Sequence, residues 1–296
     1  MIKRNLKMII ALTLIVALLP LSMFAYNIAQ RLYPVAMLEL RREFLYVGTQ
    51  IKLEEYDGKT RNISLPELLT DEATVTDNSL ILVSSAYKIR DDLSFDSVIE
   101  YKDTGLYLDS SMHEAFSELG KYIQDSFGEK LFITSAYRTA DEQQALYDEK
   151  GSDVAQRPGE SEHQTGLAAD IAVKGFGGAS FLKTDVGRYV NLHCWNYGFI
   201  IRYPSDKTEI TGIDHEPWHI RYVGIPHAEY ISKNNITLEE YHASLSLNIL
   251  YTYDKLPQYA IIKTGNVSDI IIPDNFISCT VSPDNCGNYI ISFQLY

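Results

Sequence analysis

Four side chains in two short segments could together bind and use a metal ion. His163 and Asp170 lie seven positions apart in one segment, and Glu216 and His219 lie three apart in the other. Zinc held by two histidines and one carboxylate keeps a fourth position for a water molecule, whose pKa it lowers towards about 7. A further acidic side chain could accept a proton from that water. If the two segments meet in the fold, they predict a metallohydrolase.

Glu216 has two possible roles in such a site. As a catalytic base, it would take the proton of water and pass it to the leaving amine. As a fourth ligand, it would close the site and make it structural, although structural zinc sites are usually rich in cysteine and this set has none. The residue types alone leave both interpretations open.

The residues around these side chains indicate how each segment must run. Gly166 lies within the first segment, and glycine allows a sharp turn or a close backbone approach. Glu216 and His219 have the spacing of one helix face, but Pro217 disfavours helical backbone at Glu216. Residues three apart in a regular strand face opposite sides. We therefore expect Glu216 in a turn that leads into a strand carrying His219.

Three polar side chains are candidates for substrate contacts. Arg138 follows an apolar run at residues 131–136 and precedes a capping-box sequence, so it should lie at a strand-to-helix turn. Its guanidinium could bind a carboxylate or stabilise an oxyanion, or it could form an ordinary ion pair. Gln143 and Ser161 could hydrogen-bond substrate, but capping or surface solvation would explain them equally well.

Apolar periodicity and turn residues predict the elements that position these side chains. Strands are expected at residues 80–83, 131–136, 199–203 and 219–223, and helices at residues 113–127, 139–150 and 185–197. They place a catalytic domain over residues 79–241. A stalk or spacer is expected at residues 28–78, and a small β-rich appendage at residues 242–296.

The N-terminal residues 1–27 are expected to form a cytoplasmic tip and a membrane anchor. Lys3, Arg4 and Lys7 precede an uncharged apolar run at residues 8–26, which is about long enough to cross a bilayer. Basic residues before such a run favour a cytoplasmic N-terminus and an exported remainder. A cleaved signal peptide is the alternative, but no small-x-small cleavage site is evident. Either interpretation puts the catalytic domain outside the cytoplasm, and the anchor would make the protein a single-pass membrane protein.

The composition excludes some classes of partner and of metal site. The net charge is −13, which argues against nucleic acid or an anionic membrane surface as the principal partner. No protein partner is indicated. None of the three cysteines lies in a Cys-x-x-Cys pair, so a thiolate zinc site is not expected. Cys279 and Cys286 could form a disulfide after export or remain two thiols.

Several ordered motifs resemble the VanY-type zinc D-alanyl-D-alanine carboxypeptidases. They are Ser135-Ala-Tyr-Arg-Thr139 with Gln143, and the stretches at residues 158–170, 197–204 and 216–224. The resemblance implies His163, Asp170 and His219 as zinc ligands and Glu216 as catalytic base. It also implies that Arg138 steadies the polarised carbonyl, while Gln143 and Ser161 contact substrate. The implied fold is α+β, with a central, mostly antiparallel sheet flanked by helices, as in the hedgehog and DD-peptidase folds.

The implied reaction removes the terminal D-alanine from peptidoglycan pentapeptide stems, which would destroy the target of vancomycin. Three alternatives remain. One is an L,D-carboxypeptidase that acts on tetrapeptide stems. The second is a D,D-dipeptidase of the VanX type, which the expected export disfavours because free dipeptide is cytoplasmic. The third is a metal-containing cell-wall binding module without catalysis, which the presence of Glu216 and Arg138 disfavours.

Overall fold

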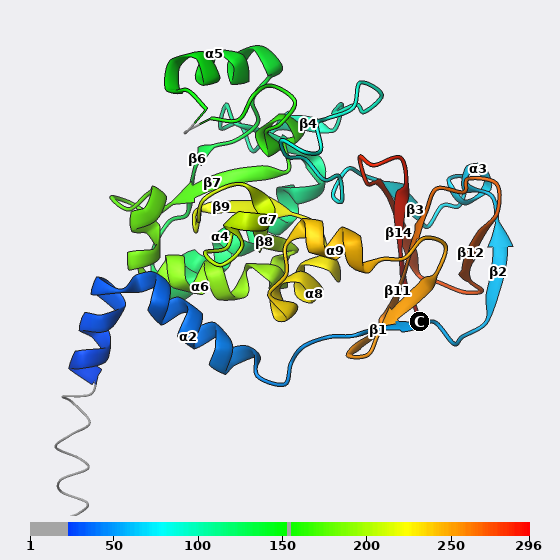
Figure 1. The fold of residues 1–296 in the computed structure, drawn as a ribbon, viewed down its shortest axis with the longest axis horizontal. Helices are drawn as coiled ribbons and strands as arrows, with labels where there is room; N and C mark the ends of the chain where they lie inside the picture. Colours follow the sequence, from blue (N-terminus) through cyan, green and yellow to red (C-terminus); the bar gives the residue numbers. More distant parts are fainter. Residues whose placement is uncertain (1–22, 153–154) are drawn as a thin grey trace, which may run out of the picture. The chain divides into compact units, whose positions relative to one another are not determined.

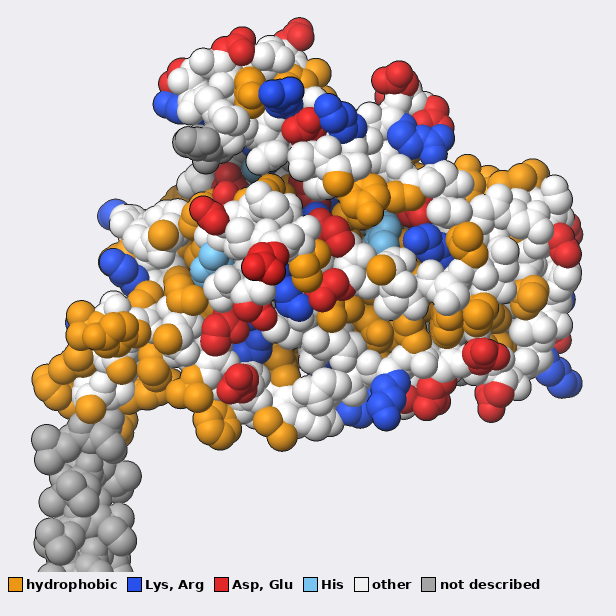
Figure 2. All heavy atoms as spheres, in the orientation of Figure 1, with side chains coloured by type: hydrophobic (Ala, Val, Ile, Leu, Met, Phe, Trp, Pro, Cys, Tyr) orange, Lys and Arg blue, Asp and Glu red, His pale blue; other side chains and the backbone are white. Residues whose placement is uncertain are grey.

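The computed structural model describes residues 23–152 and 155–296, and the chain divides into two compact units, Met1–Val47 and Gly48–Tyr296 (Figure 1). The described part of the first unit is helical, with residues 23–32 followed by α2 (Pro34–Tyr46). Its exposed side chains are largely hydrophobic (Figure 2). No helix in residues 23–152 or 155–296 has the length and apolarity needed to span a membrane. The predicted anchor within residues 1–27 lies mostly outside the described residues.

The second unit contains a four-stranded antiparallel sheet, which lies on the other side of α8 (His227–Asn234) and α9 (Leu238–Ser244) from the C-terminal strands (Figure 1). The strand order is β6 (Phe132–Ser135), β7 (Ala168–Ala172), β9 (His219–Tyr222) and β8 (Phe199–Ile201). The strands expected from the apolar runs near residues 131, 199 and 219 are therefore present. His163 and Asp170 are too far apart for one helical turn, which predicts a loop entering a strand, and β7 is that strand.

Three helices follow the sequence pattern closely. α4 (His113–Phe127) buries Phe116, Leu119 and Ile123 on one face and ends at Gly128. α5 (Ala140–Lys150) begins at the predicted capping box, in which the Thr139 and Glu142 side chains each bond the other's backbone N–H. α6 (Asp185–His193) continues into a 3-10 turn that ends at Gly198. α4 and α6 contribute to one hydrophobic core with the four-stranded sheet.

The segment Leu80–Val83 was expected to be a strand, and the structure corrects this prediction. Its side chains are buried, as the apolar run indicated. However, its backbone bonds are not those of a strand ladder, because the N–H of Leu80 donates to Ser282 Oγ and the N–H of Leu82 donates to the carbonyl of Asp284. An apolar run indicates that a segment is buried. A strand also requires a partner strand that pairs with it in register, which the run alone does not predict.

A six-stranded sheet joins both ends of the second unit. Its order is β1 (Leu53–Glu55), β10 (Leu250–Tyr253), β11 (Leu256–Thr264), β14 (Tyr289–Gln294), β13 (Ser278–Pro283) and β3 (Thr74–Thr76). A separate pair is formed by β2 (Thr60–Ile63) and β12 (Ile270–Pro273). Three short strands within the expected spacer, residues 28–78, thus pair with strands of the expected appendage, residues 242–296. The partners of β1, β2 and β3 lie about 200 residues away in the chain.

Short elements connect and cover the two sheets. α8 (His227–Asn234) and α9 (Leu238–Ser244) lie between them and share a hydrophobic core with both (Figure 1). Further elements are α3 (Leu65–Leu68), α7 (Thr208–Thr211), the 3-10 helices η1 (Ser110–Met112) and η3 (Gly178–Lys183), and the hairpin of β4 (Val98–Glu100) with β5 (Tyr107–Asp109). Cys279 and Cys286 are free thiols, the first buried and the second exposed. The structure therefore has the two thiols and not the disulfide.

Candidate metal centre and active site

The structure brings His163, Asp170 and His219 together, with one ligand atom of each lying within 4.8 Å of the others. Asp170 on β7 and His219 on β9 lie opposite each other across the strand pair. Asp170 Oδ1 is 3.1 Å from His219 Nδ1, and Asp170 Oδ2 is 3.6 Å from His163 Nε2. A tetrahedral zinc ion with bonds of roughly 2.0–2.1 Å would hold its ligand atoms roughly 3.3 Å apart. The donor set and its spacing therefore fit zinc.

The orientation of His163 also suits a metal ligand. Its Nδ1 lies 2.7 Å from the carbonyl oxygen of Ala136, which can only accept a hydrogen bond, so Nδ1 carries the proton. Nε2 is then the nitrogen with a free lone pair, and it faces Asp170. Burial lowers the pKa of His163 below its usual value, despite the opposing effect of Asp170. The ring is thus kept neutral, as a metal ligand must be.

Gly166 ends the 3-10 helix η2 (Glu162–Thr165) that carries His163 and lets the chain turn into β7. Its φ of +72° is a conformation that residues with a side chain rarely adopt. A Cβ atom there would lie 2.6 Å from Val98 Cγ2 and 2.8 Å from the backbone nitrogen of Asp109. Both uses expected for this glycine, the sharp turn and the close backbone approach, are present.

Glu216 lies in a turn that ends where β9 begins, as expected from Pro217. The N–H of His219 donates to the carbonyl of Glu216, which closes the turn. Glu216 Oε2 lies 3.6 Å from His219 Nδ1 and its side chain is 30% exposed. Burial raises the pKa of Glu216 and the nearby Asp170 adds to this rise, while His219 and Arg138 oppose it. A carboxylate with a raised pKa at the edge of the centre is suited to accept a proton.

Arg138 lies at the turn between β6 and α5, where the sequence placed it. Its backbone N–H donates to the carbonyl of His163. Its buried Nε atom has no hydrogen-bond partner among the residues that the structure describes. Burial lowers the pKa of the guanidinium, and the charges of Asp170 and Glu216 act in the opposite direction. Arg138 therefore lies close enough to the acidic side chains of the centre to feel their charge. Among the residues that the structure describes, it does not form the ordinary ion pair that was its alternative interpretation.

A cavity of about 340 Å³ adjoins the three candidate ligands. All seven side chains singled out from the sequence line it, and so do Glu162 and Tyr203. Gln143 is buried, with its Nε2 donating to the carbonyl of Gln156. Its Oε1 has no partner in the described part of the chain. Ser161 is also buried at the cavity wall.

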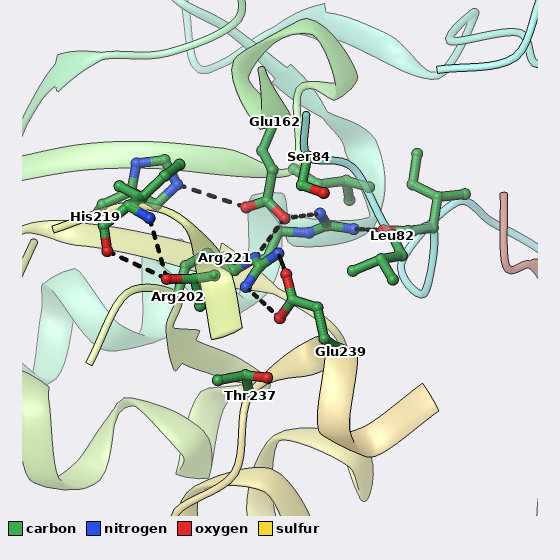
Figure 3. Close-up of polar contacts among 12 residues, drawn as sticks. Leu82, Ser84, Glu162, Arg202, His219, Arg221, Thr237 and Glu239 are labelled. Carbon is green, nitrogen blue, oxygen red and sulfur yellow. Dashed lines mark hydrogen bonds and ion pairs between the residues drawn. The ribbon is translucent and has the colours of Figure 1, made fainter. Parts of the chain in front are cut away.

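Sequence reasoning missed a buried charged cluster behind His219 (Figure 3). Glu162 is fully buried, and one of its carboxylate oxygens accepts hydrogen bonds from Arg202 and Arg221. Burial raises the pKa of Glu162, but the two guanidiniums outweigh this effect and hold it well below its usual range. Arg202 directly follows the apolar strand β8, and Arg221 lies within β9. An arginine in or beside such a strand was the available signal of a buried ion pair.

The charges around His219 favour a cation at the centre. Burial lowers the pKa of His219, yet its contacts with Asp170 and Glu162 dominate and raise it to about 9. Contacts with His163 and His219 keep the pKa of Asp170 well below its usual range despite burial. A positive charge among these groups is therefore favourable, and a metal ion supplies one.

Comparisons with known proteins agree with this geometry. The family model for VanY, described as D-alanyl-D-alanine carboxypeptidase, matches residues 105–225. A D-alanyl-D-alanine carboxypeptidase of Enterococcus faecium is 33% identical over 223 residues, which cover 67% of this chain and 71% of that relative.

Two solved structures are also similar. One is a mutant of the vancomycin resistance D,D-pentapeptidase VanY from a VanB-type resistance cassette, in complex with Zn(II). It is 35% identical with a TM-score of 0.50, and the match covers 55% of this chain and 98% of the other. The second is VanYB in complex with D-alanine-D-alanine. It is 34% identical with a TM-score of 0.50, and the match covers 56% of this chain and 97% of the other.

Proposed function

This chain belongs to the VanY family of D-alanyl-D-alanine carboxypeptidases, and we propose that it removes the C-terminal D-alanine from peptidoglycan pentapeptide stems in a zinc-dependent reaction. One observation carries the proposal. Three zinc-type ligands, a carboxylate with a raised pKa and an unpaired guanidinium nitrogen all line the same cavity of the described chain. This is the set of groups that hydrolysis of a peptide bond requires.

His163, Asp170 and His219 would hold the zinc ion. When bound, zinc supplies a Lewis acid for the scissile carbonyl and lowers the pKa of water. Glu216 accepts the proton of the attacking water and delivers it to the nitrogen of the departing D-alanine. Its raised pKa supports this role, because a carboxylate with a higher pKa is a stronger proton acceptor.

Arg138 stabilises the negative charge that develops on the carbonyl oxygen during attack. Its half-buried position supports this role, since a fixed cation acts more strongly where water is excluded. Gln143 and Ser161 hold the peptide in the cavity through hydrogen bonds. The buried Gln143 Oε1, which lacks a partner in the described residues, is an acceptor available for a substrate N–H.

We place the catalytic domain outside the cytoplasm, facing the cell wall, where peptidoglycan stems are found. The basic residues and apolar run near the N-terminus support this location, as do the exposed hydrophobic side chains of the described residues that follow. Removing the terminal D-alanine there would contribute to vancomycin resistance by removing the drug's target. The antiparallel central sheet with its flanking helices supports a hedgehog/DD-peptidase-like α+β fold.

The test is D-alanine release by the purified, zinc-loaded chain from a pentapeptide stem that ends in D-alanyl-D-alanine. A tetrapeptide stem, assayed side by side, measures L,D activity. We expect release from the pentapeptide and loss of release when a chelator removes zinc. Release from the tetrapeptide alone would contradict D,D specificity, and release from neither peptide with zinc bound would indicate a binding module without catalysis.

A further inference from the structure

The carboxylate of Glu162 is fixed from one side by two buried arginines. Its Oε1 accepts a hydrogen bond of 2.8 Å from Arg202 Nε and another of 2.8 Å from Arg221 Nη1 (Figure 3). All three side chains are completely buried. Two charge-assisted hydrogen bonds to one oxygen leave the carboxylate little freedom to rotate.

The other oxygen of Glu162 faces the candidate metal ligand His219. Glu162 Oε2 lies 3.6 Å from His219 Nε2. Neither atom has a hydrogen-bond partner among the described residues, although both are buried. A buried acceptor and a buried donor without partners are costly, and these two lie opposite each other, just beyond hydrogen-bond distance.

We propose that Glu162 is a positioning residue of the metal centre, which accepts the Nε2 proton of His219 and so directs the Nδ1 lone pair of that ring at the metal. This inference rests on the proposed zinc site. The two nitrogens of an imidazole have different roles, and the partner of one determines which role the other takes. Carboxylates commonly hold metal-binding histidines in this way. His163 is held in the opposite sense, since its Nδ1 donates to the carbonyl of Ala136 and its Nε2 faces the centre.

The arginines that hold Glu162 are themselves anchored from outside residues 105–225, the part that matches the family model. Arg202 Nη1 donates to Glu239 Oε2 on α9 at 2.9 Å. Arg221 Nη2 donates to the carbonyl oxygens of Ser79 and Ile81, at 3.0 and 2.9 Å. The positioning of His219 therefore depends on segments that flank the matched domain.

One of these anchors is attached to the C-terminal sheet. The segment that supplies the carbonyls of Ser79 and Ile81 also donates two hydrogen bonds. The N–H of Leu80 donates to Ser282 Oγ at 3.0 Å, and the N–H of Leu82 donates to the carbonyl of Asp284 at 3.3 Å. Ser282 lies on β13, and Asp284 follows that strand directly. The C-terminal sheet thereby supports the metal centre through Arg221 and Glu162, a role that its sequence did not suggest.

The test compares Glu162→Gln with Glu160→Gln. Glu160 is a matched control, because it is buried two residues before Glu162 but pairs with Lys88 and does not line the cavity. We expect the zinc dissociation constant of Glu162→Gln, measured by competition with a chelating dye, to rise about 10- to 100-fold. That of Glu160→Gln should match the unsubstituted chain. Equal zinc affinity in all three proteins would overturn the positioning role.

A second measurement needs no substitution of Glu162 and so holds even if Glu162→Gln does not fold. Long-range ¹⁵N–¹H NMR correlations of the zinc-loaded chain report which nitrogen of each histidine ring carries a proton. His219→Gln identifies the signals of His219. We expect a proton on Nε2 and metal coordination at Nδ1, and the reverse arrangement would overturn the proposal. Failure of the unsubstituted chain to bind zinc would reject the metal site itself, whereas unchanged affinity in Glu162→Gln rejects only the role of Glu162.

Discussion

Asp170 and His219 form a cross-strand pair: they lie directly opposite each other on the antiparallel strands β7 and β9, and Asp170 Oδ1 is 3.1 Å from His219 Nδ1. Two of the three candidate ligands are therefore placed by strand register alone. A slip of one residue would turn His219 to the other face of the sheet. The same strand alternation puts Arg221 on the face of His219, next to Glu162.

Glu216→Gln should greatly reduce turnover and leave zinc binding intact. The amide keeps the size of the side chain but cannot accept the proton of water. General base catalysis contributes roughly 10²- to 10⁴-fold, so kcat should fall by about that factor. The measurement is the rate of D-alanine release together with the zinc content of the purified variant. Loss of zinc from Glu216→Gln would instead assign Glu216 as a fourth ligand.

Arg138→Lys should lower kcat/KM by about 10²-fold, because lysine keeps the charge but lacks the planar, forked set of donors. Zinc content should not change, since Arg138 is not among the candidate ligands. Arg90→Lys is the control, because Arg90 is exposed and pairs with Asp92 away from the cavity. A normal kcat/KM for Arg138→Lys would contradict its role at the carbonyl.

Zinc should stabilise the folded chain as well as activate it. A ligand present at about 100 times its dissociation constant stabilises the native state by about 2.7 kcal/mol. A chelator should therefore lower the thermal midpoint, and added zinc should restore both the midpoint and D-alanine release. The zinc-dependent shift should persist in Glu216→Gln and be absent in His219→Gln. A midpoint that is insensitive to zinc in the unsubstituted chain would contradict the metal site.

Gly166→Ala should destabilise the chain more than Gly128→Ala. Both glycines have a φ near +70°, so each alanine carries the same backbone cost of about 1–2 kcal/mol. Only at Gly166 would the new Cβ atom also collide with neighbours, which adds roughly 1–3 kcal/mol. Denaturant unfolding in the presence of a chelator measures the difference without a contribution from zinc. Equal losses would show that the close approach to Val98 and Asp109 is unimportant.

His227 should make stability fall with decreasing pH. The ring is buried between Tyr241 and Ser292, and burial, aided by His242, lowers its pKa from 6.5 to about 3. Between these two pKa values the unfolded chain binds a proton that the native chain does not. The free energy of unfolding therefore loses about 1.4 kcal/mol per pH unit as the pH falls through this range.

The contribution of His227 is isolated by comparing the unsubstituted chain with His227→Gln. Between roughly pH 6 and 4, the slope of unfolding free energy against pH should be smaller in the variant by about 1.4 kcal/mol per pH unit, which corresponds to the binding of one proton. Above about pH 7.5 the slopes should coincide, because neither state binds that proton. Identical slopes at low pH would contradict a neutral, buried His227.

Most of the site could be predicted from the sequence, because its side chains have informative chemical types and lie in short segments. Ligand and base chemistry indicated His163, Asp170, Glu216 and His219 as candidates, and Pro217 correctly predicted a turn before the strand. The capping box at Thr139 correctly placed Arg138 between a strand and a helix. These inferences depend on backbone preferences over a few residues, which the local sequence determines.

Only the tertiary structure showed the contacts of Glu162 and the pairing of the strands outside the site. Glu162 could not be recognised as a partner of His219, because its contacts with Arg202 and Arg221 span 40 and 59 positions of the chain. Nor could the pairing of β1 and β3 with C-terminal strands be predicted from their short, half-polar sequences. Local sequence sets which conformations a segment favours. A buried charge or backbone group must also find a hydrogen-bond partner. That partner often lies on a distant segment, and the packing of the whole chain determines which segment it is.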